Sequence, residues 1–142
     1  MRRLDTAIDI TASPGAVWRA LTNFAAYPEW NPFIRRLVGE PRVGARLEVT
    51  VQPAGRKAMT FKPTVLVADP ERELRWLGRV IMPGVFDGEH AFVIERTSAG
   101  CRLHQEENFH GLLVPLFGAM LDDTEKSFAA LNQALKQRVE RR

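Results

Sequence analysis

One long amphipathic stretch near the C-terminus limits the folds open to this chain more than any other feature. From about Val114 onward, apolar side chains recur at the three- and four-residue spacing of one helix face. The face comprises Phe117, Met120, Leu121, Thr124, Phe128, Leu131, Leu135 and Val139. A single long helix must bury such a stripe against another large apolar surface, so the rest of the chain has to provide one.

The residues before this helix are typical of short strands separated by turns. Strands are expected over residues 3–12, 33–39, 45–52, 57–68, 73–81, 86–97 and 101–110. Proline and glycine interrupt the pattern between them, as at Pro53-Ala54-Gly55 and Pro83-Gly84. Consecutive strands joined by short turns favour an antiparallel sheet. The sequence therefore predicts an α+β fold in which a curved sheet closes over one long helix.

Two short helices are expected between the first strand and the second. Ser13 can cap a helix over residues 14–21, which has a proline in its first turn. A second short turn over residues 24–27 should end or kink at Pro28, because proline has no backbone N–H. The segment YPEWNPFI, residues 27–34, then places three aromatic side chains before the next strand. We interpret this segment as one wall of a hydrophobic cavity.

The composition fits one globular domain over residues 1–142, with 45% hydrophobic and 26% charged residues. The single cysteine, Cys101, excludes an intramolecular disulfide, and the N-terminus lacks the apolar run of a signal peptide. No apolar stretch approaches the roughly 20 residues needed to cross a bilayer. These features predict a cytoplasmic protein without stable membrane insertion.

The net charge of +3 comes from the two ends of the chain. Six of the 20 basic residues lie there, and 14 basic and 16 acidic residues remain between Leu4 and Leu135. The six are Arg2, Arg3, Lys136, Arg138, Arg141 and Arg142. Nucleic-acid binding favours a basic face with interleaved aromatic side chains, which this pattern lacks, so no nucleic-acid partner is expected.

Several segments together resemble the SRPBCC superfamily. They are VWRALTNFAAYPEWNPFI, FKPTVLVADPERELRWLGR, HQEENFHGLLVPLF and the terminal ALKQRVERR. The chain is most similar to polyketide cyclase/dehydrase-like bacterial members, relatives of START lipid-transfer domains and of the birch pollen allergen. The resemblance implies the helix-grip fold, with a seven-stranded antiparallel sheet around the C-terminal helix and two short helices after the first strand. Its members bind lipids, sterols, polyketides, plant hormones or quinones, and some cyclise or dehydrate their substrates.

The turn TSAG, residues 97–100, predicts the register of the last hairpin. If the turn pairs Arg96 with Cys101, the same register pairs Ile94 with Leu103, Phe92 with Gln105, and His90 with Glu107, and these pairs share one face. The residues expected to point inward are His90, Phe92, Ile94, Leu103, Gln105, Glu107 and Phe109. The opposite face carries Glu95, Arg102 and His104, which suit solvent. A histidine and a carboxylate on an apolar face can form an acid/base pair. They can equally satisfy each other as buried polar groups or orient a ligand, and a one-residue slip of register would turn both outward.

The cavity is expected to bind a small hydrophobic molecule such as a lipid, a polyketide or a related aromatic compound. The ligand-binding candidates are Trp30, Phe33, Met59, Phe61, Trp76, Phe92, Gln105, Phe109, Phe117, Met120, Leu121 and Thr124. One alternative is a polyketide cyclase or dehydratase that uses His90 and Glu107 as catalytic acid and base. Another alternative is a lipid or quinone carrier.

No metal or other cofactor is expected. The three histidines lack ligand spacing, and the hairpin register places His104 and His110 on the face opposite His90. The sequence has no glycine-rich nucleotide-binding motif. The identity of the ligand and the oligomeric state are left open by the sequence.

Overall fold

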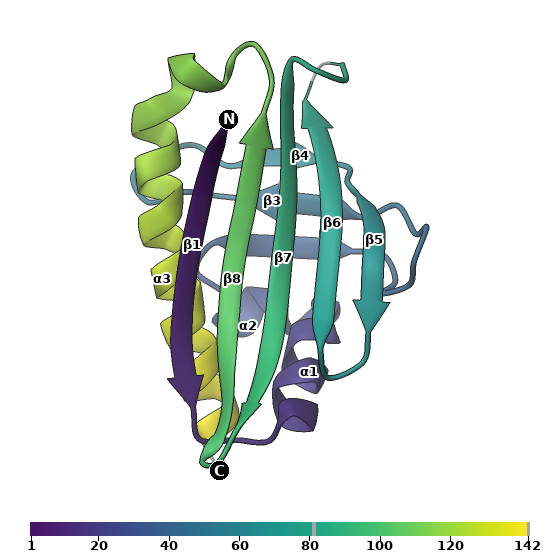
Figure 1. Ribbon diagram of the computed structural model, residues 1–142, viewed down its shortest axis with the longest axis vertical. Coiled ribbons are helices and arrows are strands. Elements are labelled where there is room, and N and C mark those ends of the chain that lie inside the picture. The colour runs from purple at the N-terminus through teal and green to yellow at the C-terminus, as the bar shows by residue number, and fades with distance from the viewer. Residues whose placement is uncertain (81, 142) are drawn as a thin grey trace.

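The computed structural model describes residues 1–80 and 82–141, and it consists of two antiparallel sheets, one long helix and several short helices (Figure 1). The strands are β1 Arg2–Ile10, β2 Ile34–Val38, β3 Glu48–Val51, β4 Met59–Phe61, β5 Thr64–Asp69, β6 Glu73–Val80, β7 Phe86–Thr97 and β8 Gly100–His110. The helices are α1 Pro14–Thr22, η1 Phe24–Ala26, α2 Tyr27–Trp30, η2 Val114–Phe117 and α3 Gly118–Glu140. The predicted end of one strand at residue 81 and the terminal Arg142 lie outside the described residues.

The expected α+β helix-grip architecture is confirmed, but the sheet is divided differently from the prediction. Five strands pair in the order β1-β8-β7-β6-β5, and three others pair in the order β2-β3-β4. Behind the larger sheet, β3 and β4 run across its strands, while α3 lies along the side of β1 (Figure 1). The two sheets are joined where Leu47 donates its N–H to the Pro63 carbonyl at 2.8 Å.

The count of seven strands was wrong, because the single strand expected over residues 57–68 is two strands. β4 ends at Phe61, and β5 begins at Thr64 in the other sheet. Pro63 lies between them, and it cannot donate a backbone hydrogen bond to continue a ladder. The chain therefore changes sheets at Lys62-Pro63, which brings β4 behind β6.

The helical segments after β1 follow from local capping. Ser13 Oγ accepts a hydrogen bond from the Ala16 N–H at 3.1 Å, which caps α1 as expected. Pro28 does not end a helical turn as predicted, because it lies in the first turn of α2. A proline at that position interrupts no intrahelical bond, since the first N–H groups of a helix have no partner.

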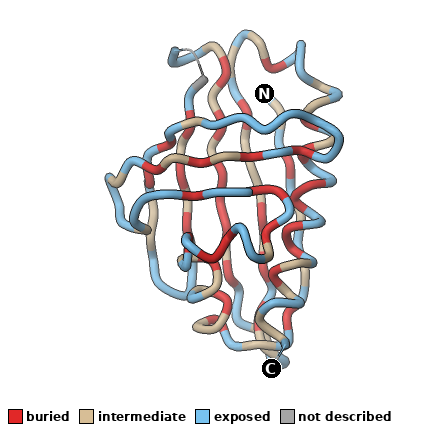
Figure 2. The backbone as a smooth tube through the Cα atoms, turned by 180° about the vertical axis from the view of Figure 1, so that it is seen from behind, coloured by how far each residue is buried: buried red, intermediate tan, exposed pale blue. Residues whose placement is uncertain are grey.

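The core lies between the two sheets and α3, and buried residues occur along the strands of both sheets and along α3 (Figure 2). On the α3 stripe, Leu121, Phe128, Leu131 and Leu135 are each 1% exposed or less. No helix in the described part of the chain is both long and apolar enough to cross a membrane.

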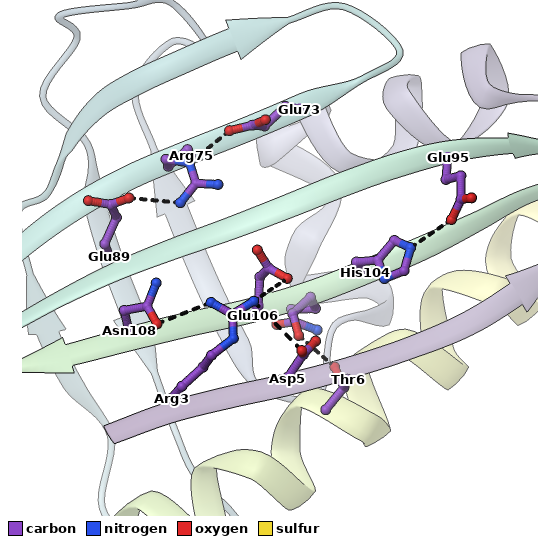
Figure 3. Close-up of polar contacts among 11 residues, drawn as sticks. Arg3, Asp5, Thr6, Glu73, Arg75, Glu89, Glu95, His104, Glu106 and Asn108 are labelled. Carbon is purple, nitrogen blue, oxygen red and sulfur yellow. Dashed lines mark hydrogen bonds and ion pairs between the residues drawn. The ribbon is translucent and has the colours of Figure 1, made fainter. Parts of the chain in front are cut away.

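The outer face of the larger sheet carries a ladder of ion pairs (Figure 3). Arg75 contacts the carboxylates of Glu73 and Glu89, each at 2.7 Å. His104 pairs with Glu95 at 3.0 Å across β7 and β8. Side chains alternate along each strand, so the residues between these charged ones point to the opposite face of the sheet, toward the core.

Candidate functional site

A cavity opens between the two sheets and the N-terminal half of α3. Its volume is about 70 Å³, and nearly all of its lining is apolar. The lining residues are Phe33, Ile34, Val49, Val51, Pro53, Met59, Phe61, Trp76, Gly78, Phe86, Gly88, His90, Glu107, Phe109, Met120, Leu121 and Thr124. Since an apolar cavity of roughly 150 Å³ holds benzene, a ring-sized guest requires some of these side chains to move.

Two glycines face each other on neighbouring strands in the cavity wall. Gly78 of β6 pairs with Gly88 of β7, two positions from the pair of Trp76 with His90. A Cβ atom at Gly78 would lie 3.0 Å from the Phe61 ring, and one at Gly88 would lie 2.3 Å from Glu107 Oε2. The absence of side chains at these two positions therefore lets the Phe61 ring and the Glu107 carboxylate pack closely against the sheet.

One polar pair lies in the wall of this apolar space. His90 Nδ1 is 3.3 Å from Glu107 Oε1, and the two side chains are 4% and 12% exposed. The residues are directly opposite on β7 and β8, as the predicted register requires. The predicted register is therefore observed for all four pairs of the hairpin, and His90 and Glu107 both turn inward, whereas Arg96 near the turn is exposed.

A buried amide network holds the other nitrogen of His90. Gln105 is fully buried, and its Oε1 lies 3.1 Å from His90 Nε2. Its Nε2 donates to the Phe128 carbonyl at 3.2 Å and to Asn132 Oδ1 at 2.7 Å. Asn132 Nδ2 in turn donates to Thr6 Oγ1 at 2.9 Å, and that hydroxyl donates to the Gln105 carbonyl at 2.8 Å.

This network fixes the tautomer of neutral His90. The Phe128 carbonyl only accepts, so the Gln105 amide nitrogen must face it and the Gln105 amide oxygen must face His90. His90 Nε2 therefore carries the hydrogen of the neutral ring, and Nδ1, at ion-pair distance from Glu107 Oε1, is the nitrogen that gains a hydrogen only when the ring is cationic.

The structure brings ten of the fourteen predicted site residues to the cavity wall. These are Phe33, Met59, Phe61, Trp76, His90, Glu107, Phe109, Met120, Leu121 and Thr124. The other four do not line it. Phe92 and Gln105 are fully buried next to His90. Phe117 is 38% exposed and packs edge-to-face against Phe86, with ring centroids 5.3 Å apart, and Trp30 packs in the same way against Tyr27 at 5.2 Å. The lining residues that the site prediction omitted include Gly78, Phe86 and Gly88.

The aromatic segment before β2 supports the cavity mainly from behind. Tyr27 is fully buried, and only Phe33 and Ile34 of this segment reach the lining. Asn31 is also fully buried, and its Oδ1 accepts hydrogen bonds from the N–H groups of Phe33 and Ile34 at 2.9 and 2.8 Å. Asn31 therefore has a structural role, because these two bonds fix the direction in which Phe33 enters the core.

The loop between β3 and β4 covers one side of the cavity. Pro53 lines the space from this loop, and Met59 lines it from the start of β4. Arg56 Nε pairs with Asp123 Oδ2 of α3 at 2.8 Å, and the Ala54 N–H donates to Ser127 Oγ at 3.2 Å. These two contacts attach the loop to the helix.

The remaining candidates for chemistry are structural. Cys101 is fully buried, and burial raises the pKa of its thiol, which disfavours the reactive thiolate. Among the described residues, no group of three or more His, Cys, Asp or Glu side chains has the arrangement of a metal site.

A long helix gripped by antiparallel sheets, with an apolar cavity and one polar pair in its wall, defines the helix-grip class of cavity proteins. The family model described as "Polyketide cyclase / dehydrase and lipid transport" matches residues 1–140. The chain belongs to this family, within the SRPBCC superfamily. Among proteins with curated descriptions, none matches the sequence.

Solved structures share the fold at low sequence identity. The Zhui aromatase/cyclase from Streptomyces sp. R1128 is 18% identical with a TM-score of 0.79, over 99% of this chain and 94% of that one. A START superfamily protein from Mycobacterium smegmatis is 22% identical with a TM-score of 0.76, over 97% of each chain. Protein MLL2253 from Mesorhizobium loti is 20% identical with a TM-score of 0.78, over 99% and 98% of the two chains.

Proposed function

We propose that this protein binds one small, largely apolar molecule in the cavity between its two sheets and α3. The observation that carries the proposal is an almost wholly apolar cavity with a single pair of ionisable side chains, His90 and Glu107, in its wall. Ligand surface withdrawn from water contributes roughly 25 cal/mol per Å² before the costs of association. The carboxylate of Glu107 then orients the ligand.

The ligand has to displace part of the lining as it enters. Met59 is 43% exposed, and Met120 is partly buried against the core. Methionine side chains are unbranched and adapt easily to a new neighbour, so Met59 and Met120 are the lining side chains that a ligand moves most easily. A guest of one or two rings fits this mode of opening.

Binding can be tested with toluene and naphthalene as probes. We expect titration of each into the ¹⁵N-labelled protein to shift the amide signals of Gly78, Gly88 and Phe109. The melting temperature should rise with probe concentration, because the probes bind the native state. Native mass spectrometry of the purified protein would detect a co-purified ligand. A lipid or quinone found in this way would favour the alternative that the protein is a lipid or quinone carrier. Unshifted cavity signals for both probes, in the wild type and in Met59→Ala, would contradict binding.

A second candidate is a cyclase or dehydratase, favoured by the contact between His90 Nδ1 and Glu107 Oε1. Both ring nitrogens of His90 are occupied, one by Glu107 and one by Gln105. Glu107 Oε2 is therefore the atom that would touch a substrate, and His90 would position it. In an aldol-type closure, this carboxylate would take a proton from one carbon as that carbon attacks a ketone carbonyl, and it would give the proton to the new alkoxide. In the loss of water that follows, it would take a second proton from carbon and give it to the departing hydroxyl.

The enzyme candidate has its own test. A linear poly-β-ketone analogue would be incubated with the wild type, and cyclised products would be measured by mass spectrometry. Glu107→Gln should abolish turnover, because an amide cannot carry the proton. Turnover that is unchanged in Glu107→Gln would remove the acid/base role.

A further inference from the structure

We propose that the ligand of this cavity carries a hydrogen-bond donor, a hydroxyl or N–H group on an apolar ring, which it donates to Glu107 Oε2. The inference rests on the proposed binding function and narrows its ligand class. The inference depends on the surroundings of the two Glu107 oxygens, because His90 lies against only one of them.

The two oxygens of Glu107 have different surroundings. Oε1 faces His90 Nδ1 at 3.3 Å, whereas Oε2 lies against Gly88, where an added Cβ would be 2.3 Å away. Both Gly88 and Glu107 line the cavity. Among the described residues, no side chain or backbone N–H donates to Oε2, and this oxygen is not fully buried.

The carboxylate of Glu107 has lone pairs on both oxygens. Oε1 lies toward His90 Nδ1 at 3.3 Å, so Oε2, against Gly88 in the cavity wall, is the oxygen with room for a donor from the ligand.

A site that presents only an acceptor selects ligands by their donors. A ketone or an ether would bring its own lone pairs against Oε2, whereas a phenol would satisfy it. An apolar cavity without such an acceptor would prefer toluene to phenol, because the phenol hydroxyl would lose its water without replacement. The relative affinity for these two molecules of equal size therefore reports directly on Oε2.

The experiment measures the dissociation constants of phenol and toluene by NMR titration of the wild type and of Met59→Ala. We expect phenol to bind at least about tenfold more tightly than toluene, because only phenol can donate a hydrogen bond to the Glu107 carboxylate. Equal affinities, or a preference for toluene, would overturn the inference and leave the binding function standing. If neither probe binds either protein, both the binding function and the inference are wrong.

Two substitutions at Glu107 distinguish the effect of the acceptor oxygen from the effect of cavity volume. Glu107→Leu should remove the preference for phenol, because no acceptor faces the cavity. Glu107→Gln should keep most of it, because the amide N–H can donate to His90 Nδ1 and leave the amide oxygen toward the ligand. A preference lost to the same extent in both variants would overturn the inference.

The two facing glycines provide a matched pair that leaves Glu107 intact. Gly88→Ala places a methyl group against Oε2 and should reduce the preference for phenol, whereas Gly78→Ala contacts the Phe61 ring and should keep it. Equal preferences in the two alanine variants would count against the position assigned to the donor. Melting curves of all variants show that the comparison is made between folded proteins.

Discussion

Tyr27 is the single tyrosine of the chain, and it is fully buried with its hydroxyl donating to the Leu21 carbonyl at 2.5 Å. Burial raises the pKa of this phenol above its ordinary value near 10, because the charged form would lose its solvation. The native protein then keeps a proton that the unfolded chain releases. Its contribution to stability is complete below about pH 10 and is lost progressively as the pH rises above that value.

We therefore expect tyrosinate absorbance to appear in the wild type only as the circular dichroism signal of the fold is lost. Tyr27→Phe should lower the free energy of unfolding by about 1 kcal/mol at neutral pH, because the hydrogen bond to Leu21 disappears. Above pH 10 the variant should lose stability less steeply than the wild type. Tyrosine that ionises in the wild type while the fold is intact would contradict this prediction.

Asn31 combines full burial with two hydrogen bonds to backbone N–H groups at the entry of β2. In Asn31→Ala these two buried donors lose their acceptor, so we expect the free energy of unfolding to fall by about 2 kcal/mol. Urea denaturation measures the change. Asn23→Ala is the control, because Asn23 is exposed and its side chain makes no cap hydrogen bond. Similar losses in the two variants would contradict the role given to Asn31.

Among the elements, the loop between β3 and β4 is the part of the cavity wall that α3 holds by polar contacts. The pair of Arg56 with Asp123 is 39% and 32% exposed, so it contributes roughly 0.2–1 kcal/mol. Arg56→Ala should therefore leave the melting temperature nearly unchanged and accelerate both binding and release of toluene, as measured by NMR line shapes. Arg36→Ala is the control, since it removes an exposed ion pair between Arg36 of β2 and Glu48 of β3. Equal exchange rates in both variants would exclude the loop as the entrance.

The last hairpin was predictable because its register follows from a local turn and the alternation of side chains. The same alternation, continued from Trp76 and His90, would have placed Gly78 and Gly88 on the inward face. Glycine has no side chain that suggests a role, so these two positions in the cavity wall were missing from the list of site residues. The sequence signal was present at both positions.

Other features could not be predicted from local pattern. Lys62-Pro63 was visible as a break, but the transfer of β4 to a second sheet depends on which distant strand it meets. The hydrogen bond from Asn132 to Thr6 joins residues 126 positions apart, and that from Gln105 to Asn132 joins residues 27 apart. Each amide is an ordinary polar residue in its own segment, and only packing of α3 on the sheet gives it a partner.

For the molecule as a whole, the central question is how a fold with about 70 Å³ of free space accepts a useful ligand. The inward side chains of the larger sheet and of α3, such as Trp76, Leu103 and Phe128, are each 1% exposed or less and form the rigid wall. In the smaller sheet, β4 is the least buried strand, and Met59 at its start is 43% exposed. Opening on this side disturbs little of the core.

Met59→Ala should therefore enlarge the range of ligands at small cost to stability. We expect naphthalene to bind the variant several-fold more tightly than the wild type, while toluene changes less, because the removed side chain matters only for the larger guest. Isothermal titration calorimetry with both compounds measures the difference. Met82→Ala is the control, because Met82 is 57% exposed and does not line the cavity. If Met59→Ala and Met82→Ala bind naphthalene equally, ligands enter through another wall, and the loop and β4 serve only to close the fold.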